Sequence, residues 1–171
     1  MELTKSVENG YVRRMQIQMI CKSFEELSLM ELMGIYRLRQ YVFVVEQNSI
    51  YEDVDGYDPG CHHLMAMDGD ELVGYTRLLP PGLKTEHSSI GRVVTKSTHR
   101  GRGIGIDLMH ASIEQVEELF EPEAIQLQAQ SYLEEFYNKF GFERVGPDYM
   151  YENILHVDMI RVSKSFDQEQ T

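Results

Sequence analysis

Apolar and polar residues alternate over residues 15–21, which is typical of a strand with one buried face. Over 28–45 the apolar residues instead recur every three or four positions, which predicts a helix. Ser28 followed by Glu31 forms a capping-box pattern at the start of this helix. Residues typical of turns fill the segment 46–61, so we expect a long connection there.

The remaining pattern predicts one hairpin and then alternating elements. Apolar runs over 64–67 and 72–79 flank Asp68-Gly69-Asp70, which is typical of a tight turn. The other expected elements are strands over 90–94, 124–129, 142–145 and 153–162 and helices over 105–120 and 131–140. This order predicts an α/β (α+β) fold whose central mixed, largely antiparallel sheet of six to seven strands is flanked by helices.

Length and charge limit the classes of function. The chain has 171 residues, near the common size of one domain. We expect a single domain over 15–162, with a flexible N-terminal extension over 1–14 and a C-terminal tail over 163–171. Acidic residues outnumber basic ones by 28 to 16, so the formal net charge is −12. Phosphate backbones repel such a chain, so nucleic acid is not an expected partner.

Hydropathy and cysteine usage indicate the compartment. No apolar run approaches the roughly 20 residues that cross a bilayer, so no membrane partner is expected. The first ten residues hold no apolar signal segment. Cys21 and Cys61 form neither a CxxC motif nor a disulfide framework. We therefore expect a cytoplasmic protein.

The segment 100–105 carries the clearest chemical signal. It reads Arg-Gly-Arg-Gly-Ile-Gly and lies between an expected strand and an amphipathic helix. Glycines let backbone N–H groups approach an anion, and the helix N-terminus adds partial positive charge. A P-loop would need Gly-Lys-Ser/Thr, and a dinucleotide fingerprint would need glycine at Ile106. The segment predicts a phosphate or pyrophosphate site, or else an exposed glycine-rich turn.

The spacing Arg-x-x-Gly-x-Gly at Arg100, Gly103 and Gly105 resembles the coenzyme A pyrophosphate loop of the GNAT family of N-acetyltransferases. Residues 129–142, which end in Tyr-x-x-x-Gly-Phe, are similar to the family's second motif. Further segments resemble the ElaA-like subfamily: 42–47, 52–58, His62-His63, 76–79 and 91–94. Asn48-Ser49 departs from this pattern, where Cys-Pro is expected. The resemblance covers about 15–162 and implies the GNAT acyl-CoA N-acyltransferase fold.

The resemblance implies acetyl-CoA as the co-substrate. Backbone groups of one strand would bind the pantetheine arm, and the glycine loop would hold the pyrophosphate. The expected cofactor-binding residues are Val93, Val94, Thr95, Arg100, Gly101, Arg102, Gly103, Ile104, Gly105 and Tyr132. By pattern alone, residues 93–95 are also explained as ordinary residues of a core strand.

The resemblance also implies the catalytic residues. Tyr137 matches the family's tyrosine near the coenzyme A sulfur, where a phenol can return a proton to the thiolate. Spacing alone would assign it to the core. A base must take a proton from the acceptor amine, and we expect Glu46 in this role. Other candidate bases remain open: Asp53, Asp55, His62, His63 and His156. The backbone N–H of Val94 would stabilise the oxyanion.

The acidic segment 52–58 has two interpretations. It is either a solvated acidic turn or a surface that binds a cationic substrate, with Asp53, Asp55 and His63 as the expected substrate-binding residues. Arg77 and Arg92 are expected to pair with it in structural salt bridges. His62 and His63 begin a strand, so they point to opposite faces. Neither HxxxH nor HxH spacing occurs there, so no metal is expected.

Together these features predict an N-acetyltransferase that transfers acetyl from acetyl-CoA to a primary amine by direct attack in a ternary complex. Direct attack is favoured because neither Cys21 nor Cys61 has an evident base beside it. Two alternatives remain: an acyl-CoA-binding sensor or interaction protein without turnover, and a nucleotide-dependent enzyme that uses the glycine loop for ATP or NAD. The acceptor stays open among a small polyamine, an amino sugar, an amino acid and a protein N-terminus. Because the family often forms dimers, a homodimer is also open.

Overall fold

The computed structural model describes residues 7–8, 11–12 and 16–163. β1 (Val7–Glu8) and β2 (Tyr11–Val12) form a small antiparallel pair. A seven-stranded sheet makes up the body, in the order β3-β4-β5-β6-β7-β9-β8. Its strands are β3 (Ile17–Ser23), β4 (His62–Asp68), β5 (Glu71–Leu79), β6 (Ser88–Thr95), β7 (Ala124–Gln130), β8 (Glu143–Tyr151) and β9 (Ile154–Val162). All neighbours are antiparallel except β6 and β7, so the predicted fold class is confirmed.

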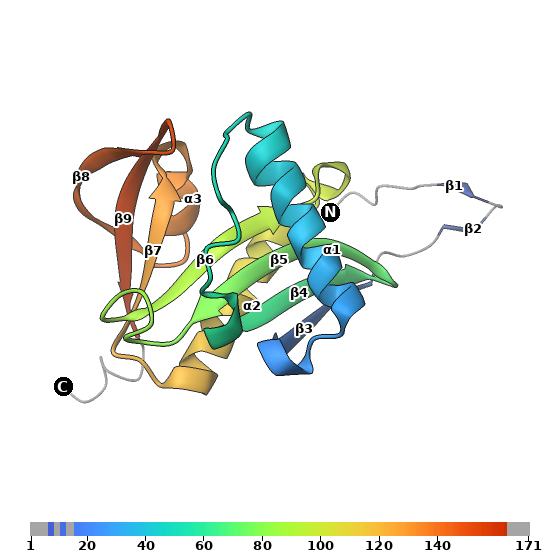
Figure 1. Ribbon diagram of the computed structural model, residues 1–171, viewed down its shortest axis with the longest axis horizontal. Coiled ribbons are helices and arrows are strands. Elements are labelled where there is room, and N and C mark those ends of the chain that lie inside the picture. The colour runs from blue at the N-terminus through green and yellow to red at the C-terminus, as the bar shows by residue number, and fades with distance from the viewer. Residues whose placement is uncertain (1–6, 9–10, 13–15, 164–171) are drawn as a thin grey trace.

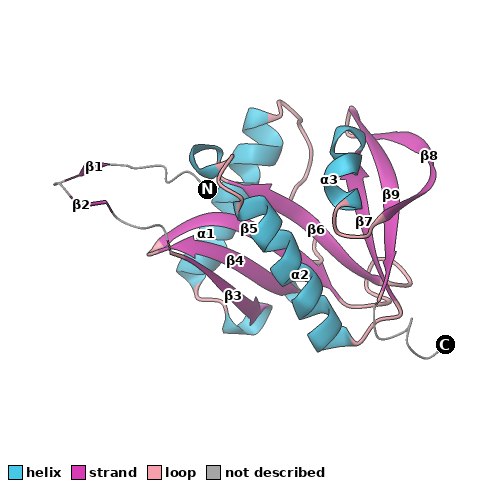
Figure 2. Cartoon of the chain, turned by 180° about the vertical axis from the view of Figure 1, so that it is seen from behind, coloured by secondary structure: helices cyan, strands magenta, loops and turns pink. Residues whose placement is uncertain are grey.

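Helices cover both faces of the sheet (Figures 1 and 2). α1 (Leu29–Arg39) lies on one face and continues into a π-helical segment, η2 (Gln40–Glu46). α2 (Ile104–Phe120) crosses the other face, and the short α3 (Glu134–Asn138) precedes β8. Short 3₁₀ turns complete the fold: η1 (Phe24–Glu26), η3 (Asp58–Gly60), η4 (Ser97–His99) and η5 (Ser131–Leu133). The predicted capping box is present, since Ser28 N–H donates to Glu31 Oε2 at 2.8 Å and Glu31 N–H donates to Ser28 Oγ at 3.2 Å.

Two hydrophobic clusters sandwich the sheet. Leu64 and Ala66 of β4 point to the α2 side, where they pack with Leu108. Met65, between them, points to the α1 side and packs with Ile35. This alternation is the strand period expected for a sheet buried on both faces. Both clusters are buried, so the central strands are packed between the two helices.

The sheet splits between β6 and β7 (Figure 1). These strands pair only through Ser88 with Ile125 and Ser89 with Gln126. Beyond those positions they diverge, and the edge of β6 facing β7 has no ladder partner there. On its other edge β6 pairs with β5, where Tyr75 opposes Val94 but Arg77 opposes Gly91. One extra residue is therefore inserted in β6, and Arg92 adopts a φ of 54° at this bulge.

Some predicted boundaries are wrong. The helix expected over 28–45 is α-helical only to Arg39, because a wider π turn follows. The helix expected over 131–140 consists of η5 and five residues of α3. The strand expected over 142–145 extends to Tyr151 across a register shift that interrupts its alternation. Most of the expected extension over 1–14 and residues 164–171 of the expected tail lie outside the described residues, whereas Ser163 is buried and its N–H donates to Glu123 O at 2.9 Å.

Candidate functional site

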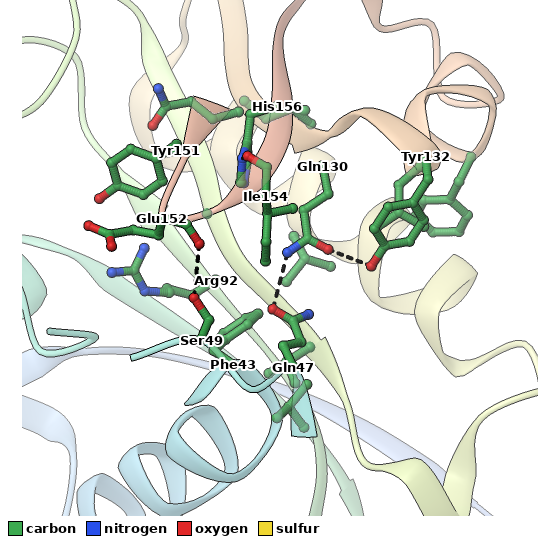
Figure 3. A pocket seen from close by; sticks show the side chains of 18 of the residues that line it. Phe43, Gln47, Ser49, Arg92, Gln130, Tyr132, Tyr151, Glu152, Ile154 and His156 are labelled. Atoms are coloured by element: carbon green, nitrogen blue, oxygen red, sulfur yellow. Dashed lines mark hydrogen bonds between the residues drawn. The ribbon is translucent and has the colours of Figure 1, made fainter. Parts of the chain in front are cut away.

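A cavity of about 400 Å³ fills the gap between β6 and β7 (Figure 3). The diverging edge of β6 over 90–95 lines one side, and β7 and β9 line the other. Two hydrogen bonds link residues of opposite walls. Gln130 Nε2 donates to Gln47 Oε1 at 3.1 Å, and Ser49 Oγ donates to the Glu152 backbone oxygen at 3.1 Å. Hydrogen bonds therefore connect the two walls of the cavity, which come from segments distant in sequence.

The glycine loop lies at one end of this cavity. A second cavity, of about 260 Å³, is lined by the loop and shares Thr95, Arg100, Gly105 and Phe136 with the first. Gly101 and Gly103 have φ values of 74° and 84°, which favour glycine. A Cβ on either would meet no atom within 4 Å, so the space beside the loop is open. Gly103 caps α2, whose first amides have no partner inside the helix. The loop and the start of α2 can therefore present backbone N–H groups to an anion.

Arg100 connects this loop to two other elements. Its Nε donates to the Thr95 backbone oxygen at 3.1 Å, and its Nη1 donates to Glu46 Oε1 at 2.6 Å. Glu46 is the last residue of η2, so the expected base lies in the cavity and is paired with the expected pyrophosphate loop. The other basic residue of the loop, Arg102, has an exposed side chain.

Tyr137 reaches the cavity from α3. Its side chain is buried, with its ring edge-on to Phe136 at a centroid distance of 5.1 Å. Burial raises the pKa of Tyr137 above its usual range, so the phenol is protonated at neutral pH. Tyr132 also lines the cavity, but it is 72% exposed and its hydroxyl donates to Gln130 Oε1. The structure thus brings Tyr137, Glu46 and the β6 edge around one space.

Three arginines pair with the aspartates of the acidic segment. Arg39 donates to Asp53 Oδ2 at 2.7 Å and to Asp58 Oδ1 at 2.8 Å. Arg77 donates to both oxygens of Asp55, at 2.6 and 2.7 Å. Desolvation raises the pKa of Asp55, but Arg77 and then Arg92 outweigh it and hold that pKa below its usual range.

Arg92 completes this ion-pair cluster. Its Nε donates to Asp53 Oδ1 at 2.6 Å, and its Nη2 donates to Asp55 Oδ2 at 3.1 Å. The predicted salt bridges of Arg77 and Arg92 are therefore confirmed. Asp53 and Asp55, expected to bind substrate, lie within this cluster instead of lining the cavity, because the arginines take their oxygens.

The three histidines that the sequence offers as candidate bases occupy three different environments. His63, also expected to bind substrate, is fully buried, with Nδ1 2.8 Å from the Tyr75 hydroxyl and Nε2 3.1 Å from the Asp58 backbone oxygen. Burial lowers its pKa, which favours a neutral ring. His62 packs on Phe120 of α2, so the prediction of opposite faces is confirmed. His156 lines the cavity, and its Nδ1 lies 2.8 Å from the Ile154 backbone oxygen.

Sequence reasoning missed several residues of the cavity. Gln47 and Gln130 lie within the segments 42–47 and 129–142 but were not assigned a role there, Glu152 lies outside every motif, and the fold alone brings these residues to one cavity. Ser49 had one signal, since it stands where the subfamily pattern has proline. Among residues 7–8, 11–12 and 16–163, no group of three metal-ligating side chains could hold a metal ion. No helix in the described part of the chain is long and apolar enough to cross a membrane.

Comparisons with known proteins give concordant findings. A family model described as an acetyltransferase (GNAT) domain matches residues 31–162. The protein ElaA of Escherichia coli is 38% identical over 138 residues, which cover 80% of this chain and 90% of ElaA. The crystal structure of an acyl-CoA N-acyltransferase from Pseudomonas aeruginosa has a TM-score of 0.82 at 37% identity, covering 86% of this chain and 100% of that one. The crystal structure of Escherichia coli ElaA has a TM-score of 0.81 at 35% identity, covering 85% and 99%.

Proposed function

Because this chain belongs to the GNAT acetyltransferase family, and within it resembles ElaA, we propose that it transfers the acetyl group of acetyl-CoA to a primary amine. The GNAT acyl-CoA N-acyltransferase fold expected from the sequence is confirmed by the two solved structures at TM-scores of 0.82 and 0.81. Family and fold make the chain an acyltransferase. The acetyl donor, the amine acceptor and the direct mechanism are the proposal.

One observation carries the proposal: the diverging edge of β6 faces a cavity that continues into the glycine loop. Unpaired backbone groups on such an edge can bind an extended amide-containing chain as an added strand would. Acetyl-CoA has such a chain between its pyrophosphate and its thioester, and it supplies the activated acetyl group. Residues 93–95 would bind the chain, and the amides of the glycine loop would bind the pyrophosphate.

The chemistry then needs two proton transfers. The amine nitrogen bonds to the acetyl carbon while the carbon–sulfur bond breaks. Glu46, directly or through water, takes a proton from the amine, which otherwise is protonated at neutral pH. Tyr137, kept protonated by burial, donates a proton to the leaving sulfur. Val94 is paired with Tyr75 of β5, so a backbone N–H of the neighbouring residues on the open edge of β6 would instead stabilise the negative charge that develops on the acetyl oxygen.

A thermal-shift comparison of acetyl-CoA, coenzyme A, ATP and NADH tests the first half of this proposal. A ligand at 100 times its Kd stabilises the folded state by about 2.7 kcal/mol, which is roughly 5–10 °C for a chain of this size. We expect that shift from the two coenzyme A species and not from ATP or NADH. If neither coenzyme A species shifts the Tm at millimolar concentration, the glycine loop is only a turn and the proposal fails.

Thiol release in the presence of amines tests the second half. We expect free thiol to appear at a rate that depends on the amine and on acetyl-CoA together, with a sequential kinetic pattern. A ping-pong pattern would contradict direct attack. Binding without any turnover across a broad amine panel would favour the sensor alternative instead.

A further inference from the structure

The cavity between β6 and β7 continues toward the closed end of the gap. A small cavity of about 80 Å³ lies there and shares part of its lining with the large one, namely Ile90, Gly91, Arg92, Leu127 and Gln128. Gln128 and Gln130 lie on the same face of β7. Because Gln130 bonds to Gln47 at the end of η2, this is the α1 side of the sheet. The two cavities therefore form one groove along β6 on that side.

Positive charge gathers at the closed end of this groove. Lys84, in the loop between β5 and β6, lines the small cavity and donates from Nζ to Gln128 Oε1 at 2.9 Å. No carboxylate of the described residues lies within ion-pair distance of its ammonium. Arg92 bonds to the aspartates through Nε and Nη2, which leaves Nη1 without a hydrogen bond to the described part of the chain.

The surroundings of Lys84 disfavour its charge. Desolvation and then the charges of Arg92 and Arg77 lower its pKa, and the more weakly acting carboxylates of Asp55 and Asp158 do not offset them. Asp55 is already bonded to two arginines, and Asp158 accepts a hydrogen bond from the Tyr149 hydroxyl at 2.8 Å. A bound anion would relieve this excess of positive charge.

The expected base lies toward the other end of the groove. Glu46 lines the large cavity beside the glycine loop, where it is paired with Arg100. Glu152, in the turn between β8 and β9, accepts a hydrogen bond from Ser49 Oγ through its backbone oxygen and lies on the side of the cavity where Figure 3 shows Arg92. The aspartates of the acidic segment add little negative charge to the groove, because arginines pair with them. The groove thus has a lysine without a carboxylate partner at its closed end, and the expected base, Glu46, at the end nearer the glycine loop.

We propose that Lys84 and Arg92 form a carboxylate subsite and that the acceptor is an amine carrying a carboxylate several bonds away. This inference rests on the proposed function, since it takes the amine to react near Val94. Val94 and Gly91 are three residues apart, a span of about 10 Å along a strand. An α-amino acid reacting through its α-amine is too short for this span, whereas a longer ω-amino acid, or a lysine-like amine with a distant carboxylate, fits it.

Matched pairs of ω-amino acids and their amides test the inference. The probes are 4-aminobutanoate, 6-aminohexanoate and 8-aminooctanoate, each beside the amide that lacks the negative charge. In wild-type protein we expect kcat/KM for the best acid to exceed that of its amide at least tenfold, mainly through KM. In Lys84→Met the ratio should fall to within twofold, with the rate on the amide unchanged. Lys22→Met, on the distant strand β3, is the control and should keep the wild-type ratio.

The outcomes separate this inference from the proposed function. If acetyl-CoA binds and amines are acetylated without a preference for the acids, or if Lys84→Met keeps that preference, the carboxylate subsite is wrong and the acetyltransferase stands. If no acid of the series is acetylated or raises the Tm of the coenzyme A complex, the subsite is wrong as well. If acetyl-CoA itself does not bind, the proposed function fails and the inference falls with it.

Discussion

Arg92 Nε donates a 2.6 Å hydrogen bond to Asp53 Oδ1, and it does so from a backbone with a φ of 54°. The positive φ belongs to the bulge that inserts an extra residue in β6 next to the cavity. The hydrogen bond joins this bulge to the segment that follows η2, which runs back along β6 on the α1 side (Figure 1). Asp53 is also bonded to Arg39, so the same carboxylate connects α1, the acidic segment and the bulge.

Two replacements of Arg92 separate the stability that comes from its ion pairs from the cost of its positive φ. Both Arg92→Ala and Arg92→Gly remove the guanidinium from a largely buried pair, and each should lower the free energy of unfolding by about 3 kcal/mol. Arg92→Gly should be the less damaging by about 1 kcal/mol, because glycine adopts a positive φ without a steric penalty. Urea unfolding of the two variants measures both effects. Equal stability of the two variants would mean that the bulge relaxes once the side chain is gone.

The ion-pair cluster predicts instability in acid. The pKa of Asp55 and that of Asp58 lie below their usual range in the folded protein. Folding therefore gains stability from these groups above the unfolded pKa of about 3.9. That stability is lost as the pH falls below about 5 toward the depressed pKa values. Urea midpoints at pH 7, 5, 4 and 3 should fall steeply over the acidic part of the series.

Asp55→Asn should flatten that dependence. The variant loses stability at pH 7, because Arg77 and Arg92 lose a charged partner, and it then loses less on acidification than the wild type does. Asp70→Asn is the matched control, since Asp70 is exposed in the turn between β4 and β5. An acid profile of Asp55→Asn that runs parallel to the wild-type profile would show that Asp55 does not carry the effect.

Local sequence signals predicted the elements whose stabilising contacts are local. The capping box of Ser28 with Glu31 and the turn at Asp68-Gly69 involve neighbours in the chain, and the structure confirms both. The glycine loop could also be predicted from the sequence, because glycines that adopt a positive φ and a following amphipathic helix form a local pattern. These signals sufficed for the order of the elements and for one end of the site.

Contacts between segments distant in the sequence could not be predicted in the same way. The split between β6 and β7 depends on where the strands stop pairing, which is after Ser89, and the hydrophobic pattern of residues 90–94 does not mark that point. The acidic segment was open to two interpretations because its partners, Arg39, Arg77 and Arg92, come from a helix and two strands. Whether a run of carboxylates is free for a substrate depends on contacts that only the fold creates.

The pair of Arg100 and Glu46 predicts separable effects on binding and turnover. Under the proposed function, Arg100→Ala should raise the Kd of acetyl-CoA at least tenfold, because a charged hydrogen-bond donor is worth about 1.5–3 kcal/mol. Glu46→Gln should leave that Kd unchanged or lower it, because Arg100 is then released from its 2.6 Å contact. Isothermal titration of each variant with acetyl-CoA measures these changes.

Turnover of the Glu46 variant tests its role as the base. We expect kcat of Glu46→Gln to fall about 100-fold at pH 7, which is typical for removal of a general base. The fall should lessen as the pH rises and the free amine becomes abundant. Glu52→Gln, at an exposed position of the acidic segment, is the control and should keep the wild-type rate. A Glu46→Gln rate within threefold of wild type would assign the base to another group, with His156 the next to replace.

Replacing Tyr137 with phenylalanine separates catalysis from packing. The ring stays between Phe136 and Phe142, and the hydroxyl makes no hydrogen bond to the described residues, so the Tm should stay within about 2 °C of wild type. Thiol release with acetyl-CoA and a reactive amine should slow about 100-fold while the Kd of acetyl-CoA stays within twofold. Tyr41→Phe, at a half-exposed position of η2, is the control for a lost phenol. A Tyr137→Phe variant with the wild-type rate would reduce Tyr137 to a core residue, and the leaving sulfur would then take its proton from water.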